Sequence, residues 1–311
     1  MDINSINKKY KITKIIALIE VLALFIIFVL FYLTREVNVK RIVYVPKGNT
    51  NYTIKYLHNR GYDISMIDKI FIRMFGYPQA GWIDLKEENM TKLDFLRKLT
   101  NSKAALVKVM IIPGETNYFI YKQIEKKLKI PNMRCNIDEG FIKPDTYYLP
   151  LGMKKDEVCK LLYDISLNWH KEISKKVFGV WNYNKYKRYL IIASIIQKEA
   201  ANKDEMKYVS AVIYNRLKLG MPLQMDGSLN YGKYSHTKIT AKRLREDKSR
   251  YNTYLYKGLP PEPVCVVSKE AILAAIFPAK VKYLYFYKCG KSHAFATTYS
   301  QHVRNIKRCS R

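Results

Sequence analysis

The sequence predicts an α+β protein of about two domains, carried behind a single N-terminal transmembrane helix. Its 311 residues exceed one average domain and fall short of three. An apolar run of 19 residues lies near the N-terminus, and short strand-like segments alternate with amphipathic helical segments after it. With 48% hydrophobic and 13% aromatic residues the chain can bury a sizeable core, which excludes wholesale disorder.

The apolar run reads IIALIEVLALFIIFVLFYL from Ile15 to Leu33 and contains one charge, Glu20. A helix of this length spans about 28 Å, close to the ~30 Å of a hydrocarbon core. Four lysines precede it, namely Lys8, Lys9, Lys11 and Lys14. The positive-inside rule then places residues 1–14 in the cytoplasm, a signal anchor at 15–34 in the cytoplasmic (inner) membrane, and the rest outside. A cleaved signal peptide is the alternative, but FYLTREV offers no small-x-small cleavage site.

Residues 40–105 have the pattern of a small α+β module. A strand in RIVYVPKG is followed by helical segments at Thr50–His58, Ser65–Phe75 and Thr91–Leu99, the last with Asn89 as its expected cap. The second of these places Ile67, Ile70, Phe71 and Met74 on one helical face.

Residues 106–311 form a larger mixed α+β region, and the boundary near 105 depends on element order alone. We expect a strand at Leu106–Ile112, a Pro-rich loop at 139–150, and helices at Tyr118–Lys129, Asp156–Leu167 and Lys171–Phe178. Five cysteines show neither C-x-x-C pairs nor zinc-ligand spacing, so free thiols are expected.

Glu199 is the candidate catalytic residue. In the helical segment Tyr186–Glu199 it follows Ile196 and Ile195 by three and four residues, so its carboxyl group extends the apolar stripe. Apolar surroundings disfavour the charged form and raise the pKa of a carboxyl group, as a general acid near neutral pH requires. The alternative is a partly exposed glutamate at a helix end with no role. A second helix, capped by Asn202 with Glu205 in a capping box, is expected next.

Polar and aromatic loops follow: LQMDGSLNYG (223–232), YNTY (251–254), GLPPEP (258–263) and HAFATT (293–298). Amides and hydroxyls match sugar hydroxyls, and aromatic faces match the apolar face of a sugar ring, so such loops are typical of carbohydrate clefts. Each loop taken alone is more typical of an ordinary turn than of a binding site.

The motifs SIIQKEA, YNRLKLGMPLQMD, YNTYLYKGLPPEP, FPAKVKYLYF and HAFATTYSQH, in this order and with EGFIKPDTY upstream, resemble the YceG-like (MltG) family of endolytic murein lytic transglycosylases. The resemblance covers nearly all of the chain after the anchor. It implies a LysM-like module at 40–105 and a catalytic domain at 106–311. The sequence departs from the family pattern at Gln197, which stands where an E-K-E-like triplet begins, and at Arg250 and Glu262.

The resemblance further implies a reaction that needs one carboxyl group and neither metal nor cofactor. Protonated Glu199 would donate to the oxygen between N-acetylmuramic acid and N-acetylglucosamine. The carboxylate would then take the proton of the C6 hydroxyl, which closes onto C1 to give a 1,6-anhydro end. The expected partners are nascent peptidoglycan strands and the membrane, and a peptidoglycan synthase is left open as a third.

The expected substrate-binding residues are Gln224, Asp226, Tyr251, Asn252, His293, Thr297 and His302. Gln224 and Asp226 are candidates for positioning the sugar or orienting Glu199, with an Asx-turn as the alternative for Asp226. Tyr251, with Tyr254 beside it, would stack on sugar or simply pack. The two histidines are read as hydrogen-bonding residues, because a metal needs more ligands than this segment offers.

Three other functions would fit parts of the sequence. A water-using muramidase would employ Asp226 as a second carboxylate. A catalytically silent wall-binding protein would explain Gln197 as a mark of lost activity. A nucleic-acid binder would suit the net charge of +29, but such proteins concentrate their basic residues, whereas here they are scattered over the whole length. We therefore expect no nucleic-acid partner, and assign the charge to an anionic membrane surface and wall polymer.

Overall fold

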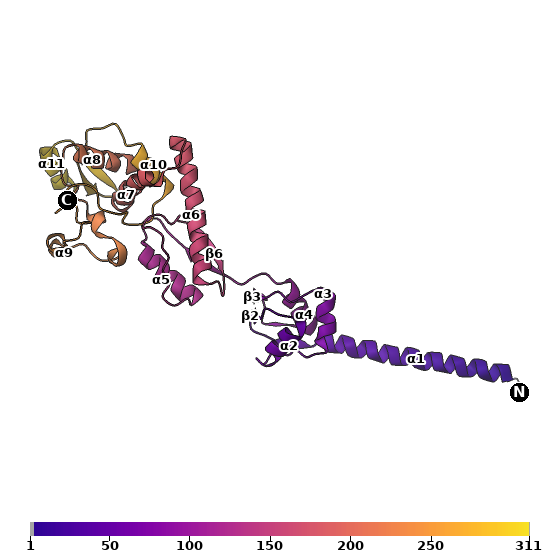
Figure 1. Ribbon diagram of the computed structural model, residues 1–311. Helices are drawn as coiled ribbons and strands as arrows, with labels where there is room; N and C mark the ends of the chain where they lie inside the picture. Colours follow the sequence, from indigo (N-terminus) through magenta and orange to yellow (C-terminus); the bar gives the residue numbers. More distant parts are fainter. Residues whose placement is uncertain (1–2, 311) are drawn as a thin grey trace. The chain divides into compact units, whose positions relative to one another are not determined.

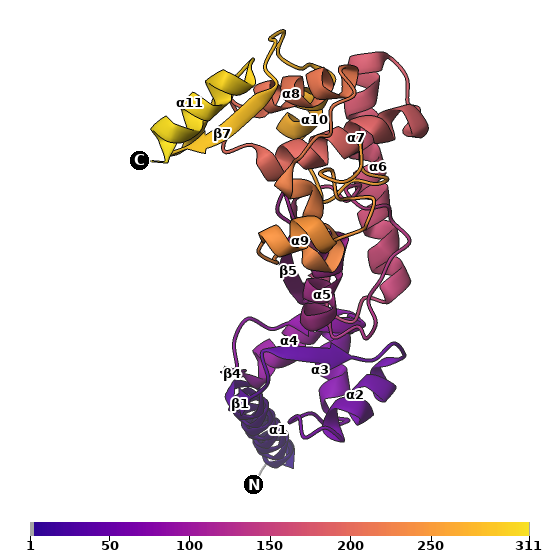
Figure 2. The same ribbon diagram turned by 90° about the vertical axis from the view of Figure 1, so that its left-hand side faces the viewer.

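The computed structural model describes residues 3–310, with side chains from residue 10 onward. Its contacts divide the chain into two compact units (Figures 1 and 2). Unit 1 comprises Met1–Leu106 with Pro150–Gly152, and unit 2 comprises Val107–Leu149 with Met153–Arg311. Helices accompany four two-stranded sheets within the described residues, so the predicted α+β class is confirmed.

Helix α1 (Ile3–Thr34) contains the predicted apolar run. Its segment Tyr10–Thr34 is long and apolar enough to cross a membrane, and the most apolar window in it has no buried residues. The last turns differ, because Val29, Tyr32 and Leu33 pack against the hydrophobic core of unit 1. The helix that would cross the membrane is therefore also part of a folded module.

Unit 1 continues with short strands and three helices. The helices are α2 (Thr50–His58), α3 (Asp68–Phe75) and α4 (Lys92–Asn101). Strand β1 (Glu36–Asn38) pairs antiparallel with β4 (Asn89–Thr91), and β2 (Ile42–Val45) pairs antiparallel with β3 (Gly81–Asp84). Thr91 caps α4 by accepting the Asp94 N–H, so the expected cap at Asn89 is wrong; that residue belongs to β4. The likeness of this module to LysM stays a prediction.

Helix α3 begins three residues later than the expected Ser65 and buries an unexpected face. Asp68 and Ile72 point into the core, whereas Ile67, Ile70 and Met74 are exposed. The buried Asp68 carboxylate forms an ion pair of 3.1 Å with the ammonium group of Lys92, which is likewise fully buried. This pair fixes the rotation of α3, and it overrides the hydrophobic pattern of the helix.

The elements from residue 106 onward carry the site. In chain order they are β5 (Leu106–Met110), α5 (Asn117–Leu128), β6 (Thr146–Pro150), α6 (Lys155–Phe178), α7 (Tyr183–Glu199), α8 (Met206–Lys218), the 3₁₀ turns η1 (Asp226–Leu229) and η2 (Gly232–Tyr234), α9 (Ala241–Glu246), α10 (Lys269–Ile276), β7 (Tyr285–Cys289), β8 (Ser292–Ala296) and α11 (Tyr299–Cys309). Strand β5 pairs with β6, and β7 forms an antiparallel hairpin with β8.

Three expectations for this region are wrong. The two helices predicted between Asp156 and Phe178 are one continuous helix, α6, which no Gly or Pro interrupts. The end of the expected loop at 139–150 is strand β6, and most of HAFATT is strand β8 rather than loop. Each of these short strands is stabilised by a partner strand, which local sequence does not reveal.

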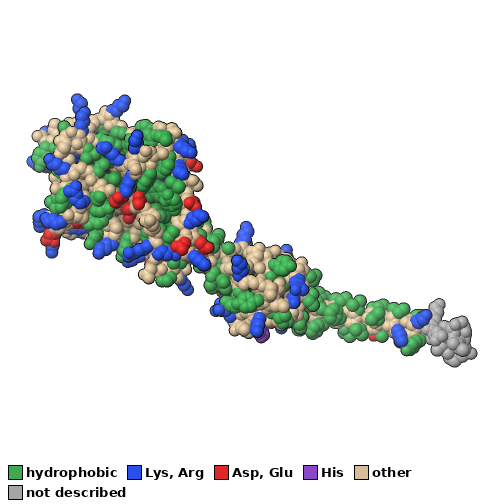
Figure 3. Space-filling model, viewed as in Figure 1, with side chains coloured by type: hydrophobic (Ala, Val, Ile, Leu, Met, Phe, Trp, Pro, Cys, Tyr) green, Lys and Arg blue, Asp and Glu red, His purple; other side chains and the backbone are tan. Residues whose placement is uncertain are grey.

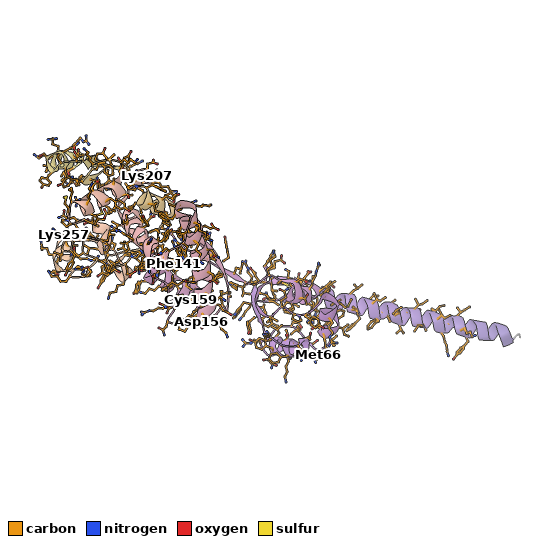
Figure 4. All side chains as sticks on the ribbon, turned by 45° about the horizontal axis from the view of Figure 1, so that its top comes forward. Met66, Phe141, Asp156, Cys159, Lys207 and Lys257 are labelled. Carbon is orange, nitrogen blue, oxygen red and sulfur yellow. A yellow bond between two sulfur atoms is a disulfide. The ribbon has the colours of Figure 1, made fainter. Side chains whose placement is uncertain are left out.

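The expectation of free thiols is also wrong for four of the five cysteines. Cys135 forms a disulfide with Cys159 on α6 (labelled in Figure 4), and Cys289 at the end of β7 forms one with Cys309 at the end of α11. Cys265 is free and buried. The partners are 24 and 20 residues apart in sequence, and only the tertiary fold brings them together.

Candidate active site

Helix α7 carries the candidate acid at its C-terminal end. It begins at Tyr183, where the Asn182 side chain accepts the Lys185 N–H, and it packs against α8, α10 and η1 (Figure 2). Its buried residues include the run from Ile192 to Ile196. An apolar stripe this wide fixes the helix in the core, and the final turn brings Glu199 to the edge of that core.

The carboxyl group of Glu199 is held by one backbone donor. The Gly227 N–H donates to its Oε1 at 2.6 Å. Burial raises the pKa of Glu199 to about 7; this hydrogen bond opposes the rise, and the charge of Asp226 adds to it. Near neutral pH the group is therefore divided between its protonated form, which can donate a proton, and its carboxylate, which can accept one.

Gly227 is at this position because η1 approaches α7 very closely. A Cβ on residue 227 would lie 2.5 Å from the Lys198 Cβ and 2.9 Å from the Glu199 Oε1. Contacts of this length are not tolerated, so a side chain here would displace either η1 or the carboxyl group. The glycine is thus part of how the acid is positioned.

Glu199 lies in the wall of a cavity of about 740 Å³ within unit 2. Polar and aromatic side chains line it. The lining residues are Lys198, Glu199, Ala200, Ala201, Arg216, Leu223, Gln224, Asp226, Tyr254, Tyr285, Phe286, Tyr287, Lys288, His293, Tyr299 and His302. Hydroxyl, amide and imidazole groups beside aromatic rings are the groups that a carbohydrate site requires.

Six of the residues singled out in the sequence meet in this cavity: Glu199, Gln224, Asp226, Tyr254, His293 and His302. Gln224 has a left-handed backbone with φ of 49°, and its N–H donates to the Thr253 carbonyl. The Tyr254 hydroxyl donates to the Asp226 carboxylate at 2.6 Å. A strained residue and an oriented carboxylate thus lie in the same loop, immediately before Gly227.

The other three predicted substrate-binding residues do not line this cavity. Tyr251 stacks on Tyr231, with ring centroids 4.2 Å apart. Asn252 is fully buried, and its amide group donates to the carbonyls of Leu244 and Asp247, so it braces its own loop. Thr297 donates to the Gln301 side chain at the start of α11.

Several charged residues were not expected in or beside the site, among them Arg216, Lys288 and Glu205. Arg216 of α8 is 8% exposed, donates to the carbonyls of Leu284 and Leu223, and lines the cavity. Glu205 accepts both the backbone N–H of His293 at 2.6 Å and a contact of 2.8 Å from its ring Nδ1. One half of the expected capping box is present, because the Asn202 side chain accepts the Glu205 N–H at 3.1 Å. The other half is wrong, because the Glu205 carboxylate orients a cavity histidine instead. Arg216 lies in the motif YNRL, and it stands out only because it is buried, which the sequence does not reveal.

The three side chains of the triplet Gln197-Lys198-Glu199 contact different partners. Gln197 accepts the Ser268 N–H at the start of α10, and Lys198 donates to the Ser235 hydroxyl. Gln197 is absent from the cavity lining. Its side-chain oxygen accepts the N–H at the start of α10, and a glutamine or an acidic residue can supply that oxygen equally well. Among the described residues, no group of three or more His, Cys, Asp or Glu side chains is placed to hold a metal ion.

The chain is similar to proteins of one family. The model of the YceG-like family matches residues 43–308. Relatives named endolytic murein transglycosylase are 37% identical over 114 residues in Bacillus subtilis, covering 36% of this chain and 32% of that protein, and 32% identical over 178 residues in Streptococcus pneumoniae (strain D39), covering 54% and 31%. The chain thus spans about a third of the length of these curated relatives.

A solved structure supports the fold. The crystal structure of a yceG-like protein from Listeria monocytogenes aligns with a TM-score of 0.53 and 24% identity, over 85% of this chain and 97% of that one. The family match extends from β2 to α11 and includes every cavity residue. The chain belongs to the YceG-like family.

Proposed function

We propose that this protein is an endolytic peptidoglycan lytic transglycosylase, which cuts nascent glycan strands between N-acetylmuramic acid and N-acetylglucosamine. The observation that carries the proposal is the buried carboxyl group of Glu199, with a pKa of about 7, in the wall of a cavity of about 740 Å³. The names of the curated relatives supply the substrate class.

One carboxyl group suffices for this reaction. Protonated Glu199 donates its proton to the glycosidic oxygen as the bond from that oxygen to C1 breaks. The C6 hydroxyl oxygen of the muramic acid then bonds to C1, and its proton returns to the Glu199 carboxylate. The product carries a 1,6-anhydro end, no water is consumed, and the acid is restored for the next cycle.

The Gly227 N–H is suited to both halves of the cycle. It donates to Oε1, which leaves the other carboxyl oxygen free to carry the travelling proton. The hydrogen bond stabilises the carboxylate that forms after proton donation, while burial favours the protonated form at the start. These opposing effects keep the pKa close to neutral.

Hydrolysis by a muramidase is the second candidate, because Asp226 lies in the same cavity as Glu199. Such an enzyme needs its second carboxylate to activate water or to attack the sugar. The Asp226 carboxylate instead accepts the Tyr254 hydroxyl, which favours an orienting role.

We further propose that α1 anchors the protein in the cytoplasmic membrane with unit 2 outside. Disulfides persist in extracytoplasmic compartments, and both of those described lie in unit 2. The net charge of +29 would then attract the chain to anionic lipid and to wall carboxylates.

Mass spectrometry of digested glycan strands tests the reaction. Purified wild type should give 1,6-anhydro ends, and Glu199→Gln should leave strands at their starting length. The matched control is Glu139→Gln, which changes another buried carboxyl group that does not line the cavity. Reducing ends would indicate hydrolysis, and equal strand lengths with wild type and Glu199→Gln would overturn the proposed enzyme.

A further inference from the structure

Within the described residues of unit 1, a group of apolar side chains on and directly beside α3 is left exposed. There are five, each between 54% and 83% exposed, and we call them the α3 patch. They are Met66, Ile67, Ile70, Met74 and Tyr77. A soluble surface rarely gathers so many large apolar residues on one short helix and its flanking residues, so the patch indicates a binding surface.

The patch is opposite the face that α3 buries. At 100° per residue, Asp68 and Ile72 lie on one side of the helix, and Ile70 and Met74 lie about 180° away. Lys69 and Arg73 lie along the flank of the patch. An apolar face bordered by basic residues is the pattern of a helix that lies at a membrane surface.

Hydrogen bonds fix this helix to the end of α1. The Tyr32 hydroxyl donates to Asp68 at 2.9 Å, and Arg35 forms an ion pair of 2.8 Å with Asp63. The start of α3 therefore lies at the level of residues 32–35 of the anchor. Figure 1 shows α3 on the side of the module from which α1 leaves, and Met66 is labelled there in Figure 4.

That level coincides with the lipid surface. A helical segment from Ile15 to Leu33 spans about 28 Å, so a bilayer core of ~30 Å that covers it ends near Leu33. Hydrophobic side chains continue from α1 onto the adjoining end of the module (Figure 3). Tyr32 lies near this level, where interfacial tyrosines are usual, at the boundary between hydrocarbon and headgroups.

We propose that the α3 patch inserts into the interfacial region of the outer leaflet of the membrane that α1 crosses. Lys69 and Arg73 would then meet anionic headgroups, and unit 1 would be held flat against the lipid. The inference rests on the proposed membrane anchoring by α1 and is independent of the reaction at Glu199.

A fluorescent reporter in the full chain tests the insertion. Met74→Cys, labelled with an environment-sensitive dye, is reconstituted into vesicles of phosphatidylethanolamine and phosphatidylglycerol. The matched control is Lys103→Cys, an exposed position where the module passes into β5. The native cysteines do not compete for the dye, because four form disulfides and Cys265 is buried.

We expect the dye at 74 to emit at shorter wavelength, to resist aqueous iodide and to be quenched by lipids that carry a shallow nitroxide. The dye at 103 should behave as in water. Adding Ile70→Glu and Ile67→Glu should expose the dye at 74 to iodide, and circular dichroism checks that the fold is kept.

Iodide quenching equal at 74 and 103 would overturn the proposal. Protection at 74 without nitroxide quenching would also overturn it, because the occupant would then be a protein rather than lipid. Measuring the shielding of the dye at 74 in a protein that also carries Glu199→Gln separates the two proposals, because insertion does not depend on the reaction. If the dye at 74 is shielded but the protein shows no transglycosylase activity even with Glu199 intact, the insertion stands and the proposed enzyme is rejected.

Discussion

Glu139 and Glu199 are two carboxyl groups of unit 2 with similar chemistry and different surroundings. Burial raises the pKa of each to about 7, and each accepts a glycine N–H, from Gly140 at 3.3 Å and from Gly227 at 2.6 Å. Glu199 lines the large cavity, whereas Glu139 does not. A raised pKa therefore reports burial, and only the adjoining cavity indicates where a substrate can meet the acid.

The two residues also differ in the helix end that they adjoin, since Glu139 lies at an N-terminal end and Glu199 at a C-terminal end. Glu139 accepts the N–H of Asn117, the first residue of α5, where the helix dipole favours an anion. Glu199 is the last residue of α7, where the dipole disfavours one. The first arrangement suits a carboxylate that stabilises a helix, and the second suits an acid that must release and recover a proton.

The largest effect expected is the loss of strand cleavage in Glu199→Gln. Removing a general acid should lower the rate by roughly 10²–10⁴-fold. Glu139→Gln should retain cleavage within a few-fold, because its side chain does not line the cavity. Rates on purified glycan strands measure both, and equal losses in the two variants would erase the distinction between them.

The glycines beside these two carboxyl groups should differ in the same way, since one substitution should affect activity and the other stability. Gly227→Ala places a methyl group 2.9 Å from the Glu199 Oε1, and a displaced acid should cost roughly 10- to 100-fold in rate. Gly140→Ala adds a methyl group 2.5 Å from the Pro263 Cβ at a φ of +76°, so it should lower the free energy of unfolding by at least about 1 kcal/mol. Rate and urea unfolding are measured for each. A Gly227→Ala enzyme with full activity would contradict the role given to that hydrogen bond.

The pH dependence should separate stability from activity. Both carboxyl groups have a folded pKa raised from 4.5 to about 7, so the stability each contributes is complete below about pH 4.5 and is lost as pH rises through 7. Each Gln variant should flatten that decline by about 1–3 kcal/mol in urea unfolding. Activity should fall above about pH 7 in wild type and in Glu139→Gln alike. An unchanged pH profile of unfolding in both variants would contradict the raised pKa values.

The smallest effect concerns the orientation of Asp226. Tyr254→Phe removes the hydroxyl that donates to Asp226, and a rate loss of roughly 2- to 10-fold is expected from one such hydrogen bond. Thr297→Ala changes a residue outside the cavity lining and should leave the rate unchanged. Should Thr297→Ala be the more damaging of the two, the substrate would contact a surface beyond this cavity.

Features with local causes could be predicted from the sequence. The periodicity of α7 placed Glu199 on a buried stripe. The apolar run predicted where α1 ends, at Thr34, although the helix begins at Ile3, well before the predicted span. The contact of Glu205 with His293 joins residues 88 apart, and the disulfides join residues 20 and 24 apart. Nothing local to either partner encodes such pairings. The rotation of α3 was missed for the same reason, since the buried partner of Asp68 lies on another helix.

The packing of the last turns of α1 has a consequence for the proposed membrane anchor. Val29, Tyr32 and Leu33 form one wall of the core of unit 1, and the Tyr32 hydroxyl bonds to the buried Asp68. Proteolytic cleavage within α1 at the bilayer surface would remove that wall and open the core to water. Unit 1 would therefore unfold once the anchor is cut off, and any soluble product of such cleavage is expected to lack a folded first unit.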